Sequence, residues 1–202
     1  MGKRSTIITA CVITFAAVLF AAGTAQAKSI VYSGSGDDVI KIAKPSGKQT
    51  QQAVASFTHS GESNFIVWAL NKKLKQTDLL VNTIGAYAGT VPLDLAHGSA
   101  TYRLEIKADG DWTVTIKPLS SVRRFTGKVA GSGDDVLSYR GGARVATITH
   151  DGESNFVVWA YYAKSTALLV NEIGPYRGKS ALSGNAILEI GADGAWSVVT
   201  KK

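Results

Sequence analysis

Four acidic positions occur twice along this chain, each time among the same neighbours, and their side chains are the first candidates for chemistry. Carboxylate oxygens gathered at one place suit Ca²⁺, a hard cation that takes six to eight oxygen ligands. The candidate metal ligands are Asp37, Asp38, Glu62 and Asp109, and then Asp134, Asp135, Glu153 and Asp193. The alternative is structural, because Gly, Asp, Ser and Asn are the residues that turns need. The sequence indicates no other cofactor.

Two histidines lie close in sequence to serines, which raises the question of a hydrolase. His59 precedes Ser63, and His150 precedes Ser154 at the same spacing. The chain has no Gly-x-Ser-x-Gly motif and no other nucleophile signature. We therefore expect each histidine to form a hydrogen bond across a turn, and we expect the protein not to be an enzyme.

Aromatic residues supply the remaining candidates. Large aromatic side chains account for much of the buried area of a small domain, so we expect the four repeated tryptophans in the core. They are Trp68 and Trp112, then Trp159 and Trp196. Tyr161 and Tyr162 have no aromatic counterparts and enter a connection of variable length. These two tyrosines are the candidate ligand-binding residues, suited to stacking against a glycan.

All of these residues belong to a module that occurs twice. Residues 58–65 (THSGESNF) recur as residues 149–156 (THDGESNF), and several further motifs return in the same order. The sequence predicts one domain over residues 28–119 and a second over residues 125–202. The short stretch between them favours a close tandem over two freely tethered domains.

Each copy has the period of strands rather than helices. Apolar and polar residues alternate through residues 102–108 and 112–116, as in a strand with one buried face. Asp109-Gly110 and Gly141-Gly142 suggest tight hairpin turns between neighbouring strands. About seven short strands per copy predict an all-β fold of two tandem antiparallel β-sandwich domains.

The connections divide into two sets. Three connections differ in length between the copies, and those that alternate with them keep their length and most of their residues. Successive strands of an antiparallel sandwich reverse direction, so alternate connections lie at the same end. One end, the constant end, should carry the repeated acids and histidines, and the opposite variable end should carry Tyr161 and Tyr162.

Residues 1–27 are typical of a cleaved export signal. Lys3 and Arg4 precede an apolar run, and Ala25-Gln26-Ala27 provides a small-x-small cleavage site. Cleavage would leave Lys28–Lys202 at a net charge of +5 instead of +7. It would also remove the only cysteine, Cys11, which excludes disulfides and Cys-ligated zinc. An uncleaved leader would instead act as a membrane anchor.

Charge and hydropathy limit the partners of the exported chain. No second apolar run is long enough to span a membrane. Basic residues are spread over both copies, and the densest run, Lys72-Lys73-Leu74-Lys75, has no interleaved aromatic residues. We therefore expect no nucleic-acid partner. Weak attraction to an anionic surface polymer is compatible with the positive charge.

The repeated motifs resemble those of known families. The motifs Thr-His-x-Gly-Glu-Ser-Asn-Phe, Leu-Leu-Val-Asn-x-Ile-Gly and Ala-Asp-Gly-x-Trp resemble a β-sandwich module of exported actinobacterial proteins and, more distantly, pre-peptidase C-terminal domains. That likeness covers both copies and implies a fold and a location, but no catalytic or ligand residues. Gly-Ser-Gly-Asp-Asp-Val also resembles one unit of the RTX calcium repeat, although it occurs singly in each copy.

These observations favour a secreted, non-catalytic binding module that acts at the cell surface or wall on a glycan or an extracellular protein. The alternative is a structural module with a Ca²⁺ site at the constant end of each sandwich. An enzyme is the third hypothesis.

Overall fold

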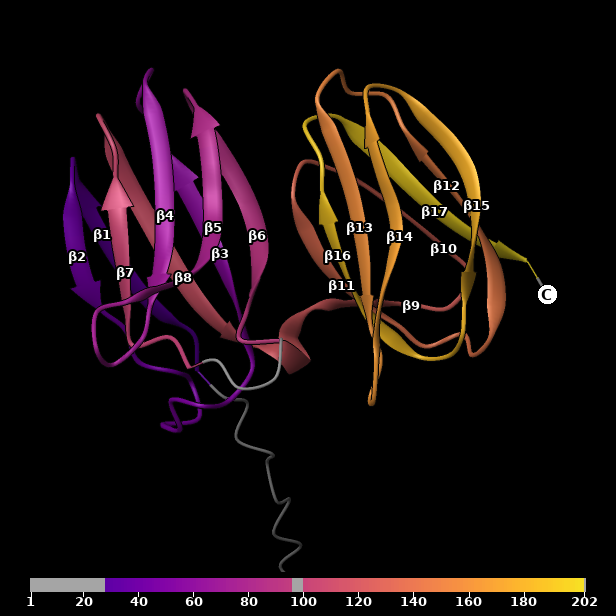
Figure 1. The fold of residues 1–202 in the computed structure, drawn as a ribbon, viewed down its shortest axis with the longest axis horizontal. Helices are drawn as coiled ribbons and strands as arrows, with labels where there is room; N and C mark the ends of the chain where they lie inside the picture. Colours follow the sequence, from indigo (N-terminus) through magenta and orange to yellow (C-terminus); the bar gives the residue numbers. More distant parts are fainter. Residues whose placement is uncertain (1–27, 96–99, 202) are drawn as a thin grey trace, which may run out of the picture.

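The computed structural model describes residues 28–95 and 100–201, which form two β-sandwiches side by side (Figure 1). Apart from one 3-10 turn, η1 (Leu119–Ser121), the regular elements of this part of the chain are strands. The prediction of an all-β fold is confirmed. The predicted leader, residues 1–27, lies outside the described residues.

Copy one contains eight strands in two sheets. They are β1 (Ile30–Ser35), β2 (Asp38–Lys41), β3 (Ala53–His59), β4 (Asn64–Leu70), β5 (Gln76–Ile84), β6 (Tyr87–Leu93), β7 (Arg103–Lys107) and β8 (Asp111–Pro118). One sheet has the order β1-β8-β3-β6 and the other the order β2-β7-β4-β5. All pairs are antiparallel.

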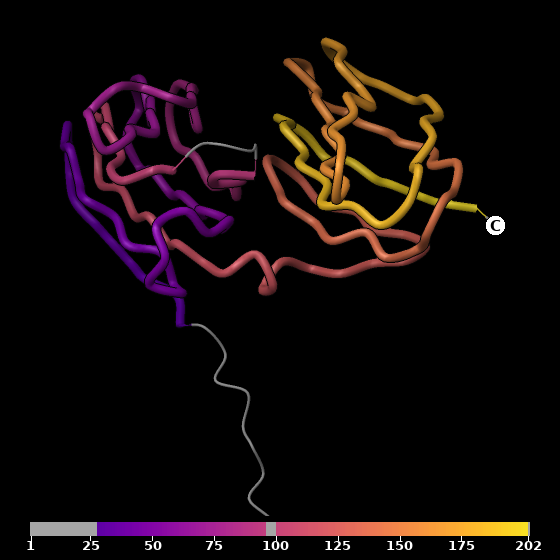
Figure 2. Tube along the Cα trace, turned by 60° about the horizontal axis from the view of Figure 1, so that its bottom comes forward, coloured from indigo at the N-terminus to yellow at the C-terminus, as the bar shows by residue number. Residues whose placement is uncertain are grey.

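Copy two repeats this topology and adds the linker to it. Its strands are β9 (Arg123–Phe125), β10 (Lys128–Ser132), β11 (Asp135–Tyr139), β12 (Arg144–His150), β13 (Asn155–Tyr161), β14 (Thr166–Ile173), β15 (Tyr176–Leu182), β16 (Ala186–Gly191) and β17 (Ala195–Lys201). The sheets are β10-β17-β12-β15 and β14-β13-β16-β11-β9. Figure 2 shows the linker passing along one side of the pair before β9 joins β11 in parallel.

Apart from β9 of the linker, each copy has eight strands instead of the predicted seven, because the Gly-Ser-Gly-Asp-Asp run separates two strands. Gly36 has a φ of 71°, in the region that favours glycine, and the chain changes sheets there. β1 pairs with β8, whereas β2 pairs with β7 in the opposite sheet. Gly133 makes the same switch in copy two, with a φ of 69°.

The predicted hairpins at Asp109-Gly110 and Gly141-Gly142 are wrong. β7 and β8, on either side of the first turn, belong to opposite sheets, and so do β11 and β12. These turns cross from one layer of the sandwich to the other. The sequence indicates a turn in both cases, but strand alternation does not identify the partner of each strand.

The tryptophans divide between the core and the outer surface. Trp112 and Trp196 are each 2 % exposed and lie in the two cores, as predicted. The prediction is wrong for Trp68 and Trp159, which are partly exposed. They pair with Glu105 and Glu189 on the outer faces of their sheets, while Phe, Val and Ala residues of the same strands fill the cores.

The copies meet edge to face. β6, at the edge of copy one, lies against β11 and β16 of copy two. The Tyr87 hydroxyl donates to Asp134 Oδ2 at 2.5 Å, and the Thr90 N–H donates to the Asp134 carbonyl at 2.9 Å. Val136, on the outer side of β11, is only 1 % exposed. The outer face of one sheet of copy two therefore receives an edge of copy one.

Candidate functional site

At the constant end, one aspartate in each copy holds a neighbouring turn in place. Asp109 Oδ2 accepts hydrogen bonds from the backbone N–H groups of Glu62 at 3.0 Å and Ser63 at 2.9 Å. These bonds, that from Glu62 first, lower the pKa of Asp109 because they favour its charged form. The Asp109 carboxylate therefore has a structural role here.

Asp193 repeats this arrangement. Its Oδ2 accepts from the backbone N–H groups of Glu153 and Ser154, both at 2.9 Å. Burial raises the pKa of Asp193, but backbone hydrogen bonds, those from Glu153 and Ser154 first among them, contribute to a net lowering of the pKa. The predicted ligands Glu62 and Glu153 contribute backbone donors to these turns, and both residues are exposed.

The histidines lie beneath these turns, as the prediction of a hydrogen bond across a turn requires. His59 Nδ1 lies 2.9 Å from the Gly85 carbonyl, and His150 Nδ1 lies 3.1 Å from the Gly174 carbonyl. In both cases Nδ1 must be the protonated donor, because a carbonyl oxygen only accepts. His59 stacks on Phe65 with ring centroids 4.4 Å apart, and His150 repeats this stacking on Phe156.

The second ring nitrogen faces the aspartate of the turn. His59 Nε2 lies 3.3 Å from Asp109 Oδ1, and His150 Nε2 lies 3.2 Å from Asp193 Oδ1, without the alignment of a hydrogen bond. Both histidine side chains are fully buried. Each therefore packs as an internal support of the turn.

The other predicted metal ligands also bond to nearby groups. Asp37 accepts from the Ala108 N–H at 3.0 Å and from Lys107 Nζ at 2.9 Å, and these bonds, that from Lys107 first, lower its pKa. Asp38 and Asp135 accept from the N–H of the next residue.

A metal site requires several ligand side chains that converge on one point. Within residues 28–95 and 100–201, no three His, Cys, Asp or Glu side chains converge closely enough to hold a metal ion. The carboxylate oxygens of Asp37, Asp109 and Asp193 already accept hydrogen bonds within the fold. No observation favours the Ca²⁺ alternative, which stays a prediction.

Tyr161 and Tyr162 line a groove between the two copies. The groove has a volume of about 420 Å³. Copy two contributes both tyrosines together with Arg140, Lys164 and Asn185. Copy one contributes Gln52 and Leu95. Aromatic rings, amide groups and two cations thus share one concave surface.

Both tyrosines are held by hydrogen bonds at the end of β13. The Tyr161 hydroxyl donates to Glu189 at 2.6 Å, and burial together with this carboxylate raises the pKa of Tyr161. The Tyr162 hydroxyl accepts from the Ser183 N–H at 3.2 Å. Tyr162 also packs against the core of copy two. The rings therefore keep fixed positions in the groove.

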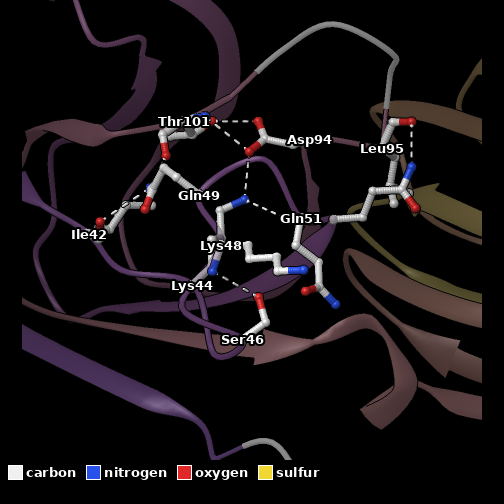
Figure 3. Close-up of polar contacts among 10 residues, drawn as sticks. Ile42, Lys44, Ser46, Lys48, Gln49, Gln51, Asp94, Leu95 and Thr101 are labelled. Carbon is white, nitrogen blue, oxygen red and sulfur yellow. Dashed lines mark hydrogen bonds and ion pairs between the residues drawn. The ribbon is translucent and has the colours of Figure 1, made fainter.

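A buried ion pair supports the copy-one wall of this groove (Figure 3). Lys44 Nζ donates to Asp94 Oδ2 at 2.6 Å and to the Gln51 carbonyl at 3.1 Å. The Lys44 and Asp94 side chains are 0 % and 3 % exposed. Burial lowers the pKa of Lys44, and the Asp94 carboxylate opposes that shift.

The partners of Asp94 complete this polar cluster. The Thr101 N–H donates to Asp94 Oδ2 at 3.0 Å, and the Thr101 hydroxyl donates to Oδ1 at 2.7 Å. The Gln49 amide donates to the Thr101 carbonyl. Asp94 adjoins Leu95, whose carbonyl accepts from Gln52 at 3.1 Å. The cluster therefore positions the two copy-one residues that line the groove.

The sequence did not identify these supporting residues. Lys44 lies in the connection that is longer in copy one, where an isolated lysine is ordinarily exposed. Arg140, Lys164 and Asn185 likewise carry no motif. The difference in length at the variable end was the only signal that pointed to this region.

A second hollow of about 460 Å³ lies at the same boundary, beside the bond between the copies. Asn82 and Tyr87 border it from copy one, and Asp134 and Asp193 border it from copy two. Its described lining contains no lysine or arginine. It offers neither the partly exposed aromatic pair nor the cations of the groove.

Acidic groups also approach one another across the boundary. Burial raises the pKa of Glu189, and Asp78 and Asp134 add to this rise through charge repulsion, which the hydrogen bond from Tyr161 partly offsets. Burial likewise raises the pKa of Asp78. The charge of Asp78 in copy one therefore favours the protonated form of Glu189 in copy two.

No protein-family model matches the chain, and a search of curated proteins finds no match. The resemblance to the exported β-sandwich module stays a prediction. Among the described residues, no helix is sufficiently long and apolar to cross a membrane.

Proposed function

We propose that this protein is an exported, non-catalytic binding module and that it holds a cell-surface or wall glycan in the groove between its two sandwiches. The observation that carries the proposal is the lining of this groove. Tyr161 and Tyr162 stand beside Arg140, Lys164 and Asn185, opposite Gln52 of copy one. Ligand sites combine apolar and aromatic walls with a few fixed polar groups in this way.

The lining favours an anionic glycan. Partly exposed tyrosine rings offer flat apolar surfaces to sugar rings, and the two amides can bond to hydroxyl groups. Arg140 and Lys164 are both exposed and attract acidic groups of a wall polymer. A volume of about 420 Å³ lies within the usual range of ligand pockets.

The histidines support the non-catalytic part of the proposal. His59 and His150 are buried under their turns, where each supports the fold in the same way. The hydrolase hypothesis would require turnover of a substrate that disappears in a His59→Ala/His150→Ala double variant.

The test is retention of the purified chain from Lys28 on insoluble wall polysaccharide. Tyr161→Ala should weaken retention by about tenfold, which corresponds to about 1.4 kcal/mol. Tyr161→Phe keeps the ring and should retain the glycan. Lys164→Glu should weaken retention, whereas Lys128→Glu makes the same charge change on β10, away from the groove. Absence of retention by the wild type, or equal losses in the two lysine variants, would refute the proposal.

A further inference from the structure

The contact between the two copies joins an edge of copy one to a face of copy two. Because the copies share one topology, each also has the surface that the other contributes, and this second surface is not used within the chain. The docking edge of copy one is β6 with Tyr87, Gly89 and Thr90, and β5 borders the hollow beside it. The docking face of copy two is the outer side of β11 and β16 around Asp134, and β13 borders the same hollow. Copy two has a corresponding edge, β14 and β15, which we call the spare edge. Copy one has a corresponding face, the outer side of β2, β7 and β4, which we call the spare face. We propose that two copies of this chain associate head to tail, with the β14–β15 edge of one docked on the β2–β7–β4 face of the next.

The spare edge has the geometry of the occupied one. Tyr87 packs against Phe65 with ring centroids 5.9 Å apart at 44°, and Tyr176 packs against Phe156 with the same values. Gly89 and Gly178 leave room for the two hydroxyls, since a Cβ at either position would overlap the tyrosine. Tyr176 therefore presents its hydroxyl as Tyr87 does, although no residue of the described chain accepts a hydrogen bond from it.

The spare face is an uncovered version of the occupied one. Val39 and Val136 occupy the same position, each paired with a glutamate on the outer side of its sheet. Val39 is 51 % exposed, whereas Val136 is 1 % exposed. The acceptor is also present, because Asp37 accepts from Ala108 N–H as Asp134 accepts from Ala192 N–H.

Charge favours a second copy as the occupant. On the spare edge, Arg177 and Lys179 replace Ala88 and Thr90 of the occupied edge. Both are exposed and would meet the exposed carboxylates of Asp37 and Asp38 on the spare face. The basic edge and the acidic turn of the same chain are thus complementary.

One difference makes the contact between chains weaker than the contact within the chain. Lys107 pairs with Asp37 at 2.9 Å, at the position that Gly191 occupies in copy two. The two side chains are 52 % and 58 % exposed, so the pair contributes little and Lys107 can move aside. Because the joined surfaces differ, association continues from chain to chain instead of stopping at a symmetric dimer. β15 and β2 lie at opposite sides of the pair of sandwiches in Figure 1, which leaves both surfaces accessible.

The experiment uses the chain from Lys28 in sedimentation equilibrium over a wide range of concentration. The wild type should show an average mass that rises with concentration and falls with added salt. Arg177→Glu/Lys179→Glu blocks the edge, and Val39→Arg blocks the face. All three positions are exposed, so both variants should keep the melting temperature of the wild type.

Each blocked variant should be monomeric by itself, and an equal mixture of the two should form a dimer. The dimer forms because the mixture contains one intact edge and one intact face. Lys72→Glu/Lys73→Glu, in the β4–β5 turn, is the matched control and should associate like the wild type. A monomeric wild type, blocked variants that still associate, or a mixture that stays monomeric would each overturn the proposal.

Discussion

The two copies have nearly the same structure at their constant ends and differ at their variable ends, which line the groove. The turn carried by His59, Gly61 and Asp109 recurs in copy two with almost the same distances. At the variable end, copy one contains the buried pair of Lys44 and Asp94. Copy two carries the two groove tyrosines there. Repetition therefore identifies the framework, and departure from it identifies the surfaces available for binding.

The first aspartate of the repeated Gly-Ser-Gly-Asp-Asp motif shows this difference most clearly. Asp37 and Asp134 lie in identical motifs and accept the same backbone hydrogen bond. Their second oxygens differ, because Asp37 pairs with Lys107 of its own copy and Asp134 accepts from Tyr87 of the other copy. Copy two has Gly191 at the position of Lys107, so Asp134 has no lysine partner there and accepts from the neighbouring copy. The same motif thus lies on an exposed surface in copy one and at an interface in copy two.

The largest expected effect concerns the variable end of copy one, which contains the buried ion pair. Lys44→Met should lower the free energy of unfolding by about 3–5 kcal/mol, because it leaves the Asp94 carboxylate buried without its cation. Arg140→Met is the control, since Arg140 is exposed and should change stability by less than about 1 kcal/mol. Urea unfolding measures both. Similar losses in the two variants would contradict a buried ion pair specific to copy one.

The next prediction tests whether the constant ends of the two copies are equally sensitive to substitution. Gly110→Ala and Gly194→Ala should each lower the free energy of unfolding by about 1–3 kcal/mol, because a Cβ would overlap the backbone of Gly61 or Gly152. Gly127→Ala is the matched control, since no atom lies within 4 Å of the added Cβ. Thermal unfolding should show equal losses in the two copies. Tolerance in one copy alone would show that the constant ends are not equivalent.

An effect of similar size distinguishes the occupied edge from the spare one. Tyr87→Phe removes a hydrogen bond to the Asp134 carboxylate, so it should lower the free energy of unfolding by about 1.5–3 kcal/mol. Tyr176→Phe should stay within about 0.5 kcal/mol at dilute concentration. Both values come from urea unfolding. A neutral Tyr87→Phe variant would mean that this bond does not hold the copies together.

The smallest effect concerns pH at the boundary. The pKa of Glu189 is raised from its ordinary value of 4.5, so the folded chain binds more protons there than the unfolded chain. Stability should therefore fall as pH rises from 4.5 through the raised pKa. Glu189→Gln should flatten this decline, and Asp78→Asn should act in the same direction. Melting temperatures measured from pH 4 upward test it, and curves parallel to the wild type would contradict it.

Local patterns explain what could be predicted of the fold and the site. Turn residues beside alternating strands indicated the all-β fold, and the position of the histidines followed from their place before a turn. Trp68 and Trp159 were misassigned because their strands are apolar on both faces, so alternation does not reveal which face is buried. The prediction of Tyr161 and Tyr162 rested on a difference between the copies, and both residues line the groove.

The sequence by itself determined that the chain is all-β, that its module occurs twice and which turns the two copies share. Each of these follows from period and turn chemistry within a few residues. Only the tertiary structure decided which sheet each strand joins, that Lys44 is buried and that the edge of copy one docks on the face of copy two. These depend on pairing between distant segments. Asp37 and Asp134 have the same local sequence, and the second partner of Asp134 comes from the other copy.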